Sequence, residues 1–357
     1  MNINSNIKIR IGTRDSALAV WQAQQVQDFF TQQSIASEII FIKSDGDADL
    51  ITPLYAMGVQ GVFTKSLDAA LLNSRIDVAV HSLKDVPIQT AKGLQQAAVL
   101  KRHSAKDILV YKTPNDRYRT MDTGNKMIDC VIATGSIRRA AQWKNRFPNH
   151  TIENLRGNVN TRLHKLQEST WNGAIFAAAG LERLGIRPEN SIDLDWMLPA
   201  PAQGAVAVFC RKNDVNILEA CQLMNDIETE LCTKTERDFL NALAGGCAAP
   251  ISALATMNAG VITMTGNILS PTGSIKIETE ISALIGNSYY LGERCAEAVL
   301  NKGADKLIAK HERYIAQAIN RQTELSFTQP VTGNQSAVHN ILPNKKNIQN
   351  IKNLVLQ

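Results

Sequence analysis

The segment HSLKDVP, residues 81–87, contains residue types that can bind and polarise a charged ligand. It follows a short strand predicted from DVAVH, and it places Ser82, Lys84 and Asp85 in one loop that a proline ends. A carboxylate beside an ammonium group stays ionised near neutral pH, so Asp85 can hold N–H groups or stabilise a developing cation. A surface Lys–Asp pair in a turn is the alternative interpretation, and the segment taken alone favours it.

A second segment, ATGSIRR at residues 133–139, places two arginines at the start of a predicted helix. Thr134 and Ser136 open this helix after a strand, and Arg138 and Arg139 lie in its first turn. The free N–H groups of a helix start and two guanidinium groups together form a strong receptor for a carboxylate or a phosphate. Two arginines on a solvent-exposed helix face are the competing interpretation, and the pattern leaves both open.

The segment LRGNVNTRL, residues 155–163, repeats this arrangement. Arg156 ends a predicted strand, Gly157 permits the turn, and Arg162 lies one turn into the next helix. The other basic residues that follow predicted strands are Arg14 and Arg183. Basic residues at several strand ends predict a cleft that holds several carboxylates at once, because a single phosphate needs fewer cations.

The net charge of +5 is concentrated in two parts of the chain. Residues 138–165 hold seven basic residues and one acid, which gives +6, and residues 311–357 hold five basic residues and two acids, which gives +3. The rest of the chain therefore sums to −4. A basic region in a mildly acidic body indicates a locally bound anion. Nucleic-acid binding is disfavoured, because only 5% of the residues are aromatic and the basic residues interrupt an α/β pattern.

Cys247 follows two glycines and precedes Pro250, so we expect it on a tight, exposed loop after a helix. A lone cysteine in such a loop can be a nucleophile, a covalent anchor or an ordinary loop residue, and the sequence leaves these open. The other five cysteines lie in apolar surroundings and are predicted to be buried. The spacing of cysteines and histidines fits no metal site, disulfide framework or catalytic triad, so no metal is predicted.

Predicted strands and helices alternate up to about residue 210, which is typical of parallel sheets with helices on both faces. The predicted strands are 7–12, 38–43, 77–81, 107–111, 130–134, 151–155, 173–178 and 205–211, and the predicted helices are 16–30, 62–72, 136–147 and 161–166. Two such runs predict two α/β domains that face a cleft. The remaining elements, helices at 233–244, 295–300 and 304–320 and an antiparallel pair at 261–269 and 274–284, predict a smaller α+β domain.

Several classes of protein are excluded by composition. No apolar run approaches the roughly 18 residues that span a membrane, and the first residues resemble neither a secretion signal nor a transit segment. We therefore expect a cytoplasmic protein without a membrane partner. The Asn-rich end of the chain has apolar residues at helical spacing, but a disordered extension is favoured over a short docking helix.

Taken together, these segments resemble the porphobilinogen deaminase family of haem and tetrapyrrole biosynthesis. The resemblance covers about 310 residues in family order, and the combination of HSLKD, LRGNVNTR and GGC is its most specific part. The matching segments are IRIGTRDSALAVWQA, GVFTKSLDAALL, DVAVHSLKDVP, ATGSIRRAAQ, LRGNVNTRLHKL, GAIFAAAGLERLG, LPAPAQGAVAV and LNALAGGCAAPI.

The resemblance implies three domains. Two α/β domains shaped like a type II periplasmic binding protein would surround the cleft, and a smaller α+β domain would carry Cys247. The implied boundaries are 1–104 with 205–222 for domain 1, 105–204 for domain 2 and 223–312 for domain 3, with a polar, largely disordered extension at 313–357. A monomer is the family expectation.

The resemblance also implies a transferase that joins four porphobilinogen molecules head to tail with loss of ammonia, giving hydroxymethylbilane. Cys247 would hold a dipyrromethane cofactor through a thioether. Asp85 would be catalytic, holding pyrrole N–H groups and stabilising the azafulvenium cation that ammonia loss leaves. The other residues implied at the cofactor are Ser82, Lys84, Thr134, Ser136, Arg138, Arg139, Arg156 and Gln203. Those implied at the substrate are Arg14, Ser16, Arg162 and Arg183.

The chain departs from the family pattern at four places. Val59-Gln60-Gly61 replaces Gly-Lys-Gly before the Phe that precedes the helix at 62–72, which removes one positive charge. Gly135 replaces a serine, which removes one hydroxyl group. Ala202 replaces a glycine before Gln203, and Ser252 replaces a glycine. None of these changes touches Asp85, Cys247 or the arginines, so activity is still expected.

Two other functions compete with this one. A non-catalytic solute-binding protein for a polycarboxylate would have the same two-domain shape, but it predicts a secretion signal and no need for Cys247. A nucleic-acid-associated protein would use the basic tail, and its affinity would fall steeply with salt.

Overall fold

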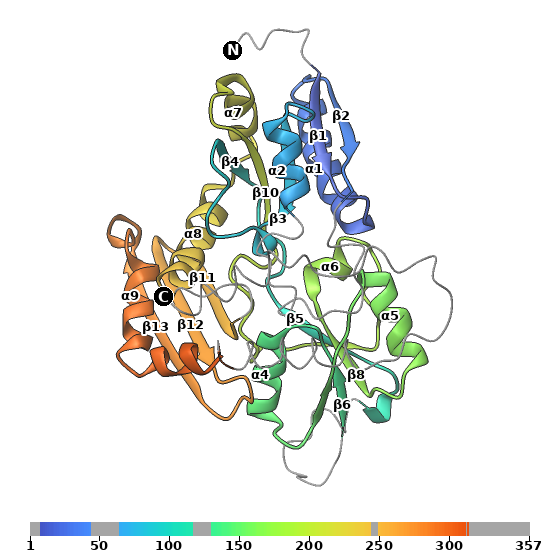
Figure 1. The fold of residues 1–357 in the computed structure, drawn as a ribbon, viewed down its shortest axis with the longest axis vertical. Helices are drawn as coiled ribbons and strands as arrows, with labels where there is room; N and C mark the ends of the chain where they lie inside the picture. The colour runs from blue at the N-terminus through green and yellow to red at the C-terminus, as the bar shows by residue number, and fades with distance from the viewer. Residues whose placement is uncertain (1–7, 44–63, 117–129, 244–248, 312, 314–357) are drawn as a thin grey trace, which may run out of the picture. The chain divides into compact units, whose positions relative to one another are not determined.

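The structure is a computed structural model that describes residues 8–43, 64–116, 130–243, 249–311 and 313. The contacts within the chain divide it into two units, Met1–Ile315 and Ala316–Gln357, and the second unit lies outside the described residues. The described elements form two five-stranded sheets and one three-stranded sheet, with helices packed against them (Figure 1). This mixture confirms the predicted fold class, while the predicted domain boundaries stay a prediction.

The first sheet has the strand order β2-β1-β3-β10-β4. Strands β1 (Ile9–Thr13), β2 (Ser37–Phe41) and β3 (Val78–Ser82) are parallel, as predicted. Strand β10 (Val206–Arg211) is antiparallel to β3 and to β4 (Leu94–Val99), so the prediction of parallel pairing throughout was wrong. The chain re-enters this sheet where β3 ends, with Val206 opposite Ser82, and must therefore run back along β3.

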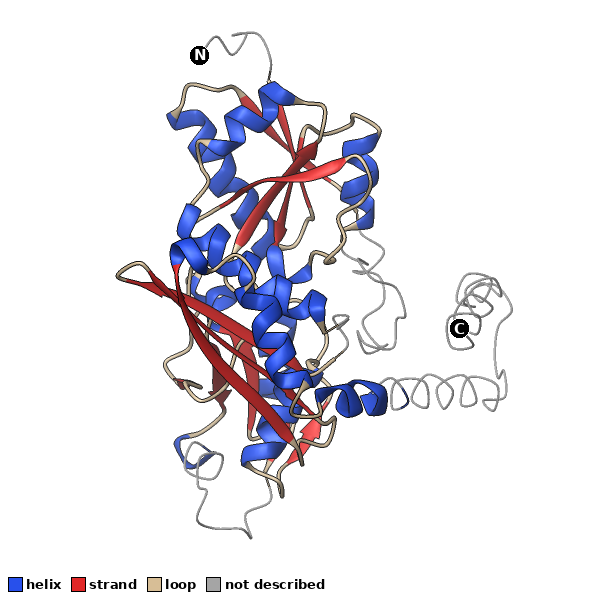
Figure 2. Ribbon diagram, turned by 90° about the vertical axis from the view of Figure 1, so that its left-hand side faces the viewer, coloured by secondary structure: helices blue, strands red, loops and turns tan. Residues whose placement is uncertain are grey.

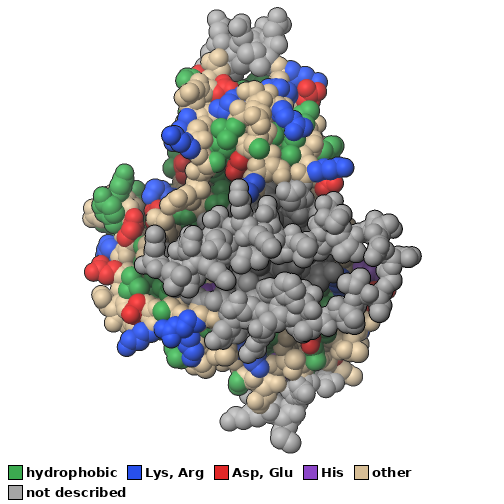
Figure 3. Space-filling view, viewed as in Figure 1, with side chains coloured by type: hydrophobic (Ala, Val, Ile, Leu, Met, Phe, Trp, Pro, Cys, Tyr) green, Lys and Arg blue, Asp and Glu red, His purple; other side chains and the backbone are tan. Residues whose placement is uncertain are grey.

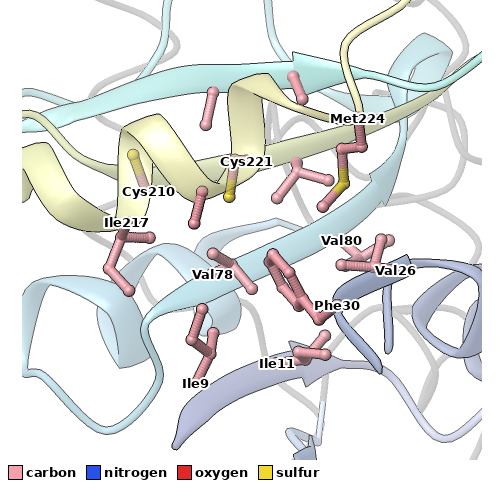
Figure 4. Packing of buried hydrophobic residues seen from close by; sticks show 14 of the residues in the cluster. Ile9, Ile11, Val26, Phe30, Val78, Val80, Cys210, Ile217, Cys221 and Met224 are labelled. Atoms are coloured by element: carbon pink, nitrogen blue, oxygen red, sulfur yellow. The ribbon is translucent and has the colours of Figure 1, made fainter. Parts of the chain in front are cut away.

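Helices cover both faces of the first sheet. On one face, Val78 and Val80 pack with Phe30 of α1 (Ala17–Gln32) and with α7 (Val215–Gln222), as Figure 4 shows. On the other face, Ala79 packs with Leu71 of α2 (Lys65–Leu72). Because successive side chains of a strand point to opposite faces, the uninterrupted apolar run of β3 supplies both cores.

The second sheet has the order β7-β6-β8-β5-β9. Its strands are β5 (Asp107–Tyr111), β6 (Val131–Ala133), β7 (Thr151–Glu153), β8 (Gly173–Ala177) and β9 (Ser191–Asp193), and its helices are α4 (Ile137–Arg146), α5 (Val159–Glu168) and α6 (Ala178–Glu182). Strand β6 is parallel to β7 and β8, whereas β5 is antiparallel to β8 and β9. Trp143 of α4 packs on one face, and Leu166 of α5 and Leu181 of α6 pack on the other.

The third sheet is antiparallel, in the order β11 (Ile251–Asn258), β12 (Val261–Leu269) and β13 (Lys276–Leu284). The predicted β12–β13 pair is confirmed, whereas β11 was not predicted. Helices α8 (Ile227–Ala242) and α9 (Leu291–Leu300) lie against this sheet (Figure 2). Phe239 of α8 and Cys295 of α9 belong to the core that they form with it. Two short 3₁₀ helices, η3 (Leu83–Asp85) and η4 (Ile285–Asn287), follow β3 and β13.

One buried carboxylate joins the third sheet to both connections between the first two sheets. Glu236 of α8 is 0% exposed, and it accepts hydrogen bonds from Arg102 at 2.5 and 3.1 Å, from the Ala202 N–H at 2.6 Å and from the Ala255 N–H at 2.8 Å. Arg102 lies between β4 and β5, Ala202 lies between β9 and β10, and Ala255 lies in β11. Ala202 has φ +61°, a left-handed conformation that favours glycine.

Candidate active site

The end of β3 places Asp85 beside the start of α1. Asp85 is exposed at the end of η3, and it lines a cavity of about 80 Å³ together with Arg14, Ser16, His81 and Ser82. The Ser82 hydroxyl accepts a hydrogen bond from Gln22 Nε2 at 2.8 Å. The structure therefore brings together four of the predicted site residues around one small cavity.

The charge of this cavity comes from Arg14 and Asp85. Burial, together with the neighbouring Arg14, lowers the pKa of His81 to about 4, so His81 is neutral at physiological pH. Ser16 is the N-cap residue of α1, and its hydroxyl makes no capping hydrogen bond. The cavity thus combines the N–H groups of a helix start, a guanidinium and a hydroxyl, a set that suits a carboxylate.

A second group of predicted residues is assembled around Asp107, which the sequence analysis did not single out. Asp107 is 0% exposed, and both arginines of α4 contact it: Arg138 Nη2 at 2.8 Å, and Arg139 through Nε at 3.0 Å and Nη2 at 2.8 Å. Gln203 Nε2 donates to Asp107 at 2.9 Å. Arg138 Nη1 also donates to the Leu198 carbonyl at 2.7 Å, and Arg139 Nη1 donates to the Ile175 carbonyl at 3.1 Å.

This pairing changes the charge of the predicted anion receptor. Two arginines and one aspartate leave a net charge of +1 at this point, so the basic window is weaker than its sequence suggests. Burial raises the pKa of Asp107, but Arg138 and Arg139 outweigh it and hold the pKa below its usual value. The sequence marks Asp107 only as an acid directly before the apolar run ILVY, and this is weak evidence for a buried carboxylate.

Lys84 connects the Asp85 loop to the Asp107 group. Its Nζ donates to Gln203 Oε1 at 3.4 Å, and Gln203 in turn bonds to Asp107. Burial lowers the pKa of Lys84 to about 8, against the opposing influence of the neighbouring Asp85. Lys84 thus lies between the two groups, with its charge partly destabilised.

The start of α4 is built as the sequence predicted. Ser136 is its N-cap, and its hydroxyl accepts from the Arg139 N–H at 3.4 Å, while Thr134 Oγ1 accepts from the Ser136 N–H at 3.2 Å. A Cβ atom at Gly135 would lie 2.5 Å from the Leu155 carbonyl oxygen. A serine would therefore not fit here without a backbone shift, which explains why this chain keeps glycine at 135.

The start of α5 carries the next two arginines. Arg156 is buried, and Arg162 Nε donates to the carbonyl of Gly157 at 2.7 Å. Gly157 has φ +116°, so the turn there requires glycine as predicted. Burial, and then the charges of Arg139 and Arg156, lower the pKa of Arg162 to about 10, while Asp85 opposes this effect. The start of α5 therefore lies close enough to Arg139 and Asp85 for their charges to act on Arg162.

Arg183 is placed apart from the Asp85 cavity. Its Nη2 donates to the Gly204 carbonyl at 2.6 Å, and its guanidinium carbon lies 5.3 Å from the centre of the Trp21 ring. It lines a separate groove that shares no lining residue with the Asp85 cavity. The predicted contact between Arg183 and substrate is therefore not part of the arrangement seen around Asp85.

Arg237, which the sequence analysis missed, fixes the loop that carries Lys84 and Asp85. Its guanidinium donates to the carbonyls of Val86 at 2.9 Å, Pro87 at 2.8 Å and Leu83 at 3.3 Å. Arg237 follows Glu236 in α8, so neighbouring residues of one helix hold the loop and both connections between the sheets. No local motif marks these contacts, because they span about 150 residues of sequence.

We expect Arg237→Met to lower the free energy of unfolding by about 1.5–3 kcal/mol, because it removes hydrogen bonds from a charged donor to three carbonyls. We also expect kcat to fall about tenfold with little change in KM, since the loop loses its position rather than its charges. Chemical denaturation and steady-state kinetics measure these effects, with Lys234→Met on the same helix as the control. Equal losses of kcat in both variants would contradict the positioning role.

Two of the predicted features lie outside the described residues: Cys247 with its glycine loop, and the Val59-Gln60-Gly61 departure. In the described ranges, no group of three or more His, Cys, Asp or Glu residues is placed to hold a metal ion. The described helices also include none that is long and apolar enough to cross a membrane.

The Ser252 departure has a clear structural role. Ser252 is buried in β11, and its hydroxyl accepts a hydrogen bond from Gln142 Nε2 of α4 at 3.0 Å. Gln142 also bonds to the backbone of Leu198. The serine therefore ties the third sheet to the helix that carries Arg138 and Arg139.

Two family models match the chain. The model described as "Porphobilinogen deaminase, dipyromethane cofactor binding domain" matches residues 9–219, and "Porphobilinogen deaminase, C-terminal domain" matches residues 230–301. The porphobilinogen deaminase of Legionella pneumophila (strain Paris) is 37% identical over 306 residues, covering 84% of this chain and 97% of that protein. The porphobilinogen deaminase of Syntrophotalea carbinolica is 37% identical over 310 residues, covering 85% of this chain and 96% of that protein.

The chain also has a distant likeness to solved structures. An ancestral cationic amino acid solute binding protein is 13% identical, covers 61% of this chain and 87% of its own, and has a TM-score of 0.41. The VFT2 domain of Bordetella pertussis BvgS is 11% identical, and the match covers 61% of this chain and 86% of that chain, with a TM-score of 0.37.

The fold is a mixed α/β one, and the matching family models and relatives define an enzyme of the transferase class. The chain belongs to the porphobilinogen deaminase family, and its cofactor is dipyrromethane. The family membership favours the predicted enzyme over a solute-binding protein. On the described part of the face in Figure 3, basic and acidic side chains are interspersed, with no continuous basic surface of the kind that nucleic acid binding favours.

Proposed function

We propose that this chain joins four porphobilinogen molecules head to tail on a dipyrromethane held by Cys247, releases one ammonia for each, and hydrolyses the product to hydroxymethylbilane. The observation that carries the proposal is the position of Asp85. One exposed carboxylate lies beside a small cavity with Arg14, and the Lys84–Gln203–Asp107 chain adjoins it. Acetate and propionate groups would meet cations and hydroxyls there, while a pyrrole N–H would meet Asp85.

The residues present fit a dipyrromethane with four carboxylate arms. Lys84, Arg138 and Arg139 supply cations near Asp107, and Arg162 supplies another from α5. The Ser16 hydroxyl, without a capping bond, is a further donor. When bound, dipyrromethane supplies the pyrrole carbon to which the first substrate unit is joined. In this proposal the chain's own cations bind and orient its carboxylates.

Asp85 acts on the substrate. The C–N bond of the protonated aminomethyl group breaks, its electron pair leaves with the nitrogen as neutral ammonia, and the positive charge spreads over the pyrrole ring. The Asp85 carboxylate stabilises that charge and holds the ring N–H. A pyrrole carbon of the bound chain would form the C–C bond that replaces the broken C–N bond, with one proton released to solvent. A fixed charge opposite a developing cation lowers the barrier by on the order of several kcal/mol.

The mass of the intact protein tests the proposed attachment. We expect the purified chain, from cells able to make porphobilinogen, to exceed its sequence mass by one dipyrromethane unit. Cys247→Ser should lose this excess, whereas Cys232→Ser, at a buried cysteine of α8, should keep it. A wild-type mass equal to that of the bare sequence would refute the attachment.

Lys84 should make substrate binding depend on pH. Because its pKa is lowered to about 8, its ammonium loses the proton as pH rises through that value, and its attraction for a carboxylate is lost. A bound carboxylate raises the pKa, so the loss occurs above pH 8 in the loaded enzyme. We expect KM for porphobilinogen to rise several-fold between pH 7 and pH 9.5, and Lys84→Arg to flatten this profile. The same profile in both enzymes would contradict the role of Lys84.

We also propose that the enzyme acts as a monomer in the cytoplasm. The described fold supports this in one respect, because the three sheets supply the whole Asp85 and Asp107 arrangement from one chain. Sedimentation velocity with and without porphobilinogen tests the oligomeric state.

A further inference from the structure

A second cavity lies along α1, separate from the Asp85 cavity. It is a groove of about 350 Å³, and its α1 wall consists of side chains three or four residues apart, including Trp21, Gln25, Phe29 and Gln32. The Asp85 cavity uses other α1 side chains, Leu18, Ala19 and Gln22. Residues at that spacing share one stripe of a helix, so the two cavities lie on neighbouring stripes of α1.

The groove contains a buried hydrogen-bond donor without an acceptor. Arg183 is only 8% exposed, and its Nη2 bonds to the Gly204 carbonyl at 2.6 Å. Its Nε is buried and has no hydrogen-bond partner among the described residues. An unpaired buried donor costs free energy, and a charged donor costs more, so this wall of the groove favours an acceptor with negative charge.

The other lining groups define the shape and charge of a suitable ligand. Lys101 adds a second cation, while His103 is neutral near pH 7 because burial and Arg183 lower its pKa. Asp28 is the one acid in the lining, and it is exposed. The Trp21 ring packs edge-on against His103 at 5.6 Å, and Phe29 and Met224 extend the apolar wall. The groove therefore offers two cations together with aromatic and apolar side chains, and Gln25, Gln32 and Asp28 supply the other polar groups of its lining.

We propose that this groove is a second ligand site that binds a small planar aromatic carboxylate, with its carboxylate at Arg183 and Lys101 and its ring along Trp21 and Phe29. The site joins parts of both α/β sheets, since α1 packs on the first sheet and Arg183 follows α6 of the second. An occupant would therefore contact α1, Arg183 and the connection between the sheets that includes Lys101 and His103.

Calorimetric titration of the full-length holoenzyme with 2-naphthoate tests the proposal, with neutral 2-naphthamide as the control for charge. We expect one naphthoate per chain with a dissociation constant on the order of 0.1–1 mM, and affinity for the amide at least about tenfold weaker. Gln25→Trp fills the groove and should abolish binding. Lys101→Glu should weaken binding by about fivefold or more, while Lys92→Glu, an exposed reversal elsewhere near the first sheet, should change it less than about twofold.

The outcomes separate this site from the dipyrromethane site. Loss of binding in Gln25→Trp and Lys101→Glu, with binding kept in Lys92→Glu, supports the proposal. Naphthoate that binds all variants equally is held elsewhere, including at the cations around Asp107, and overturns it. Equal weakening by the two charge reversals, or no binding at about 10 mM, also overturns it. Because the readout is binding, these results do not depend on turnover of porphobilinogen.

Discussion

Asp85→Asn should reduce the turnover of porphobilinogen by a factor on the order of 10²–10³ or more while the protein stays folded. The change keeps the size of the side chain and removes its charge. Asp85 is exposed, and η3 is held by Arg237 through backbone carbonyls, so the fold does not rest on the Asp85 side chain. The amide cannot offset the positive charge that develops when ammonia leaves.

Single-turnover measurement of ammonia release gives the rate, and intact mass shows whether the variant still carries dipyrromethane. Asp305→Asn, which removes an exposed charge at a residue that lines neither cavity, is the matched control and should keep near-normal rates. An Asp85→Asn enzyme that keeps its cofactor and turns over at a near-normal rate would remove Asp85 from the proposed chemistry.

The second large effect is expected at Asp107. Asp107→Asn leaves Arg138 and Arg139 buried with no carboxylate between them, and we expect it to lower the free energy of unfolding by about 3–5 kcal/mol. Asp193→Asn removes a partly exposed carboxylate that pairs with Lys106 and Arg187, so it should cost about 1 kcal/mol or less. Urea denaturation at neutral pH compares the two variants, and equal losses would contradict the role given to Asp107.

The sign of the pH dependence gives an independent check. Asp107 has a lowered pKa in the folded chain, so its contribution is complete above the pKa of the unfolded chain, about 3.9. That contribution is lost as pH falls toward the folded pKa. The wild-type protein should therefore lose more stability than Asp107→Asn does between pH 5 and pH 3.

Local pattern was enough to predict most of the elements. The strands at 107–111 and 261–269 agree residue for residue with β5 and β12, because each is an apolar or alternating run with clear ends. The antiparallel course of β10 could not be read in this way, since the direction of a strand depends on where the chain re-enters the sheet. Strand β4 was missed because LQQAAV has little β propensity, and its pairing with β10 stabilises it.

The site was predictable in its residue types and not in its pairings. Motifs around Ser136 and Gly157 indicated helix starts, and the structure shows those starts. The roles of Asp107 and Arg237 were not predicted because their partners lie far away in the sequence, so no short segment contains both members of a contact. The role of the arginines stays a prediction, and the sequence did not show that a buried acid, Asp107, neutralises part of the charge of Arg138 and Arg139.

The Glu236 junction has a consequence for movement of the two α/β sheets. Both connecting segments are hydrogen-bonded to the Glu236 carboxylate. A rotation of one α/β sheet relative to the other would therefore turn about the backbone near Arg102 and Ala202. The next residue of the same helix, Arg237, holds the loop that carries Asp85. Adjacent residues of one turn of α8 therefore contact both the connecting segments about which such a rotation would occur and the loop that positions the Asp85 carboxylate.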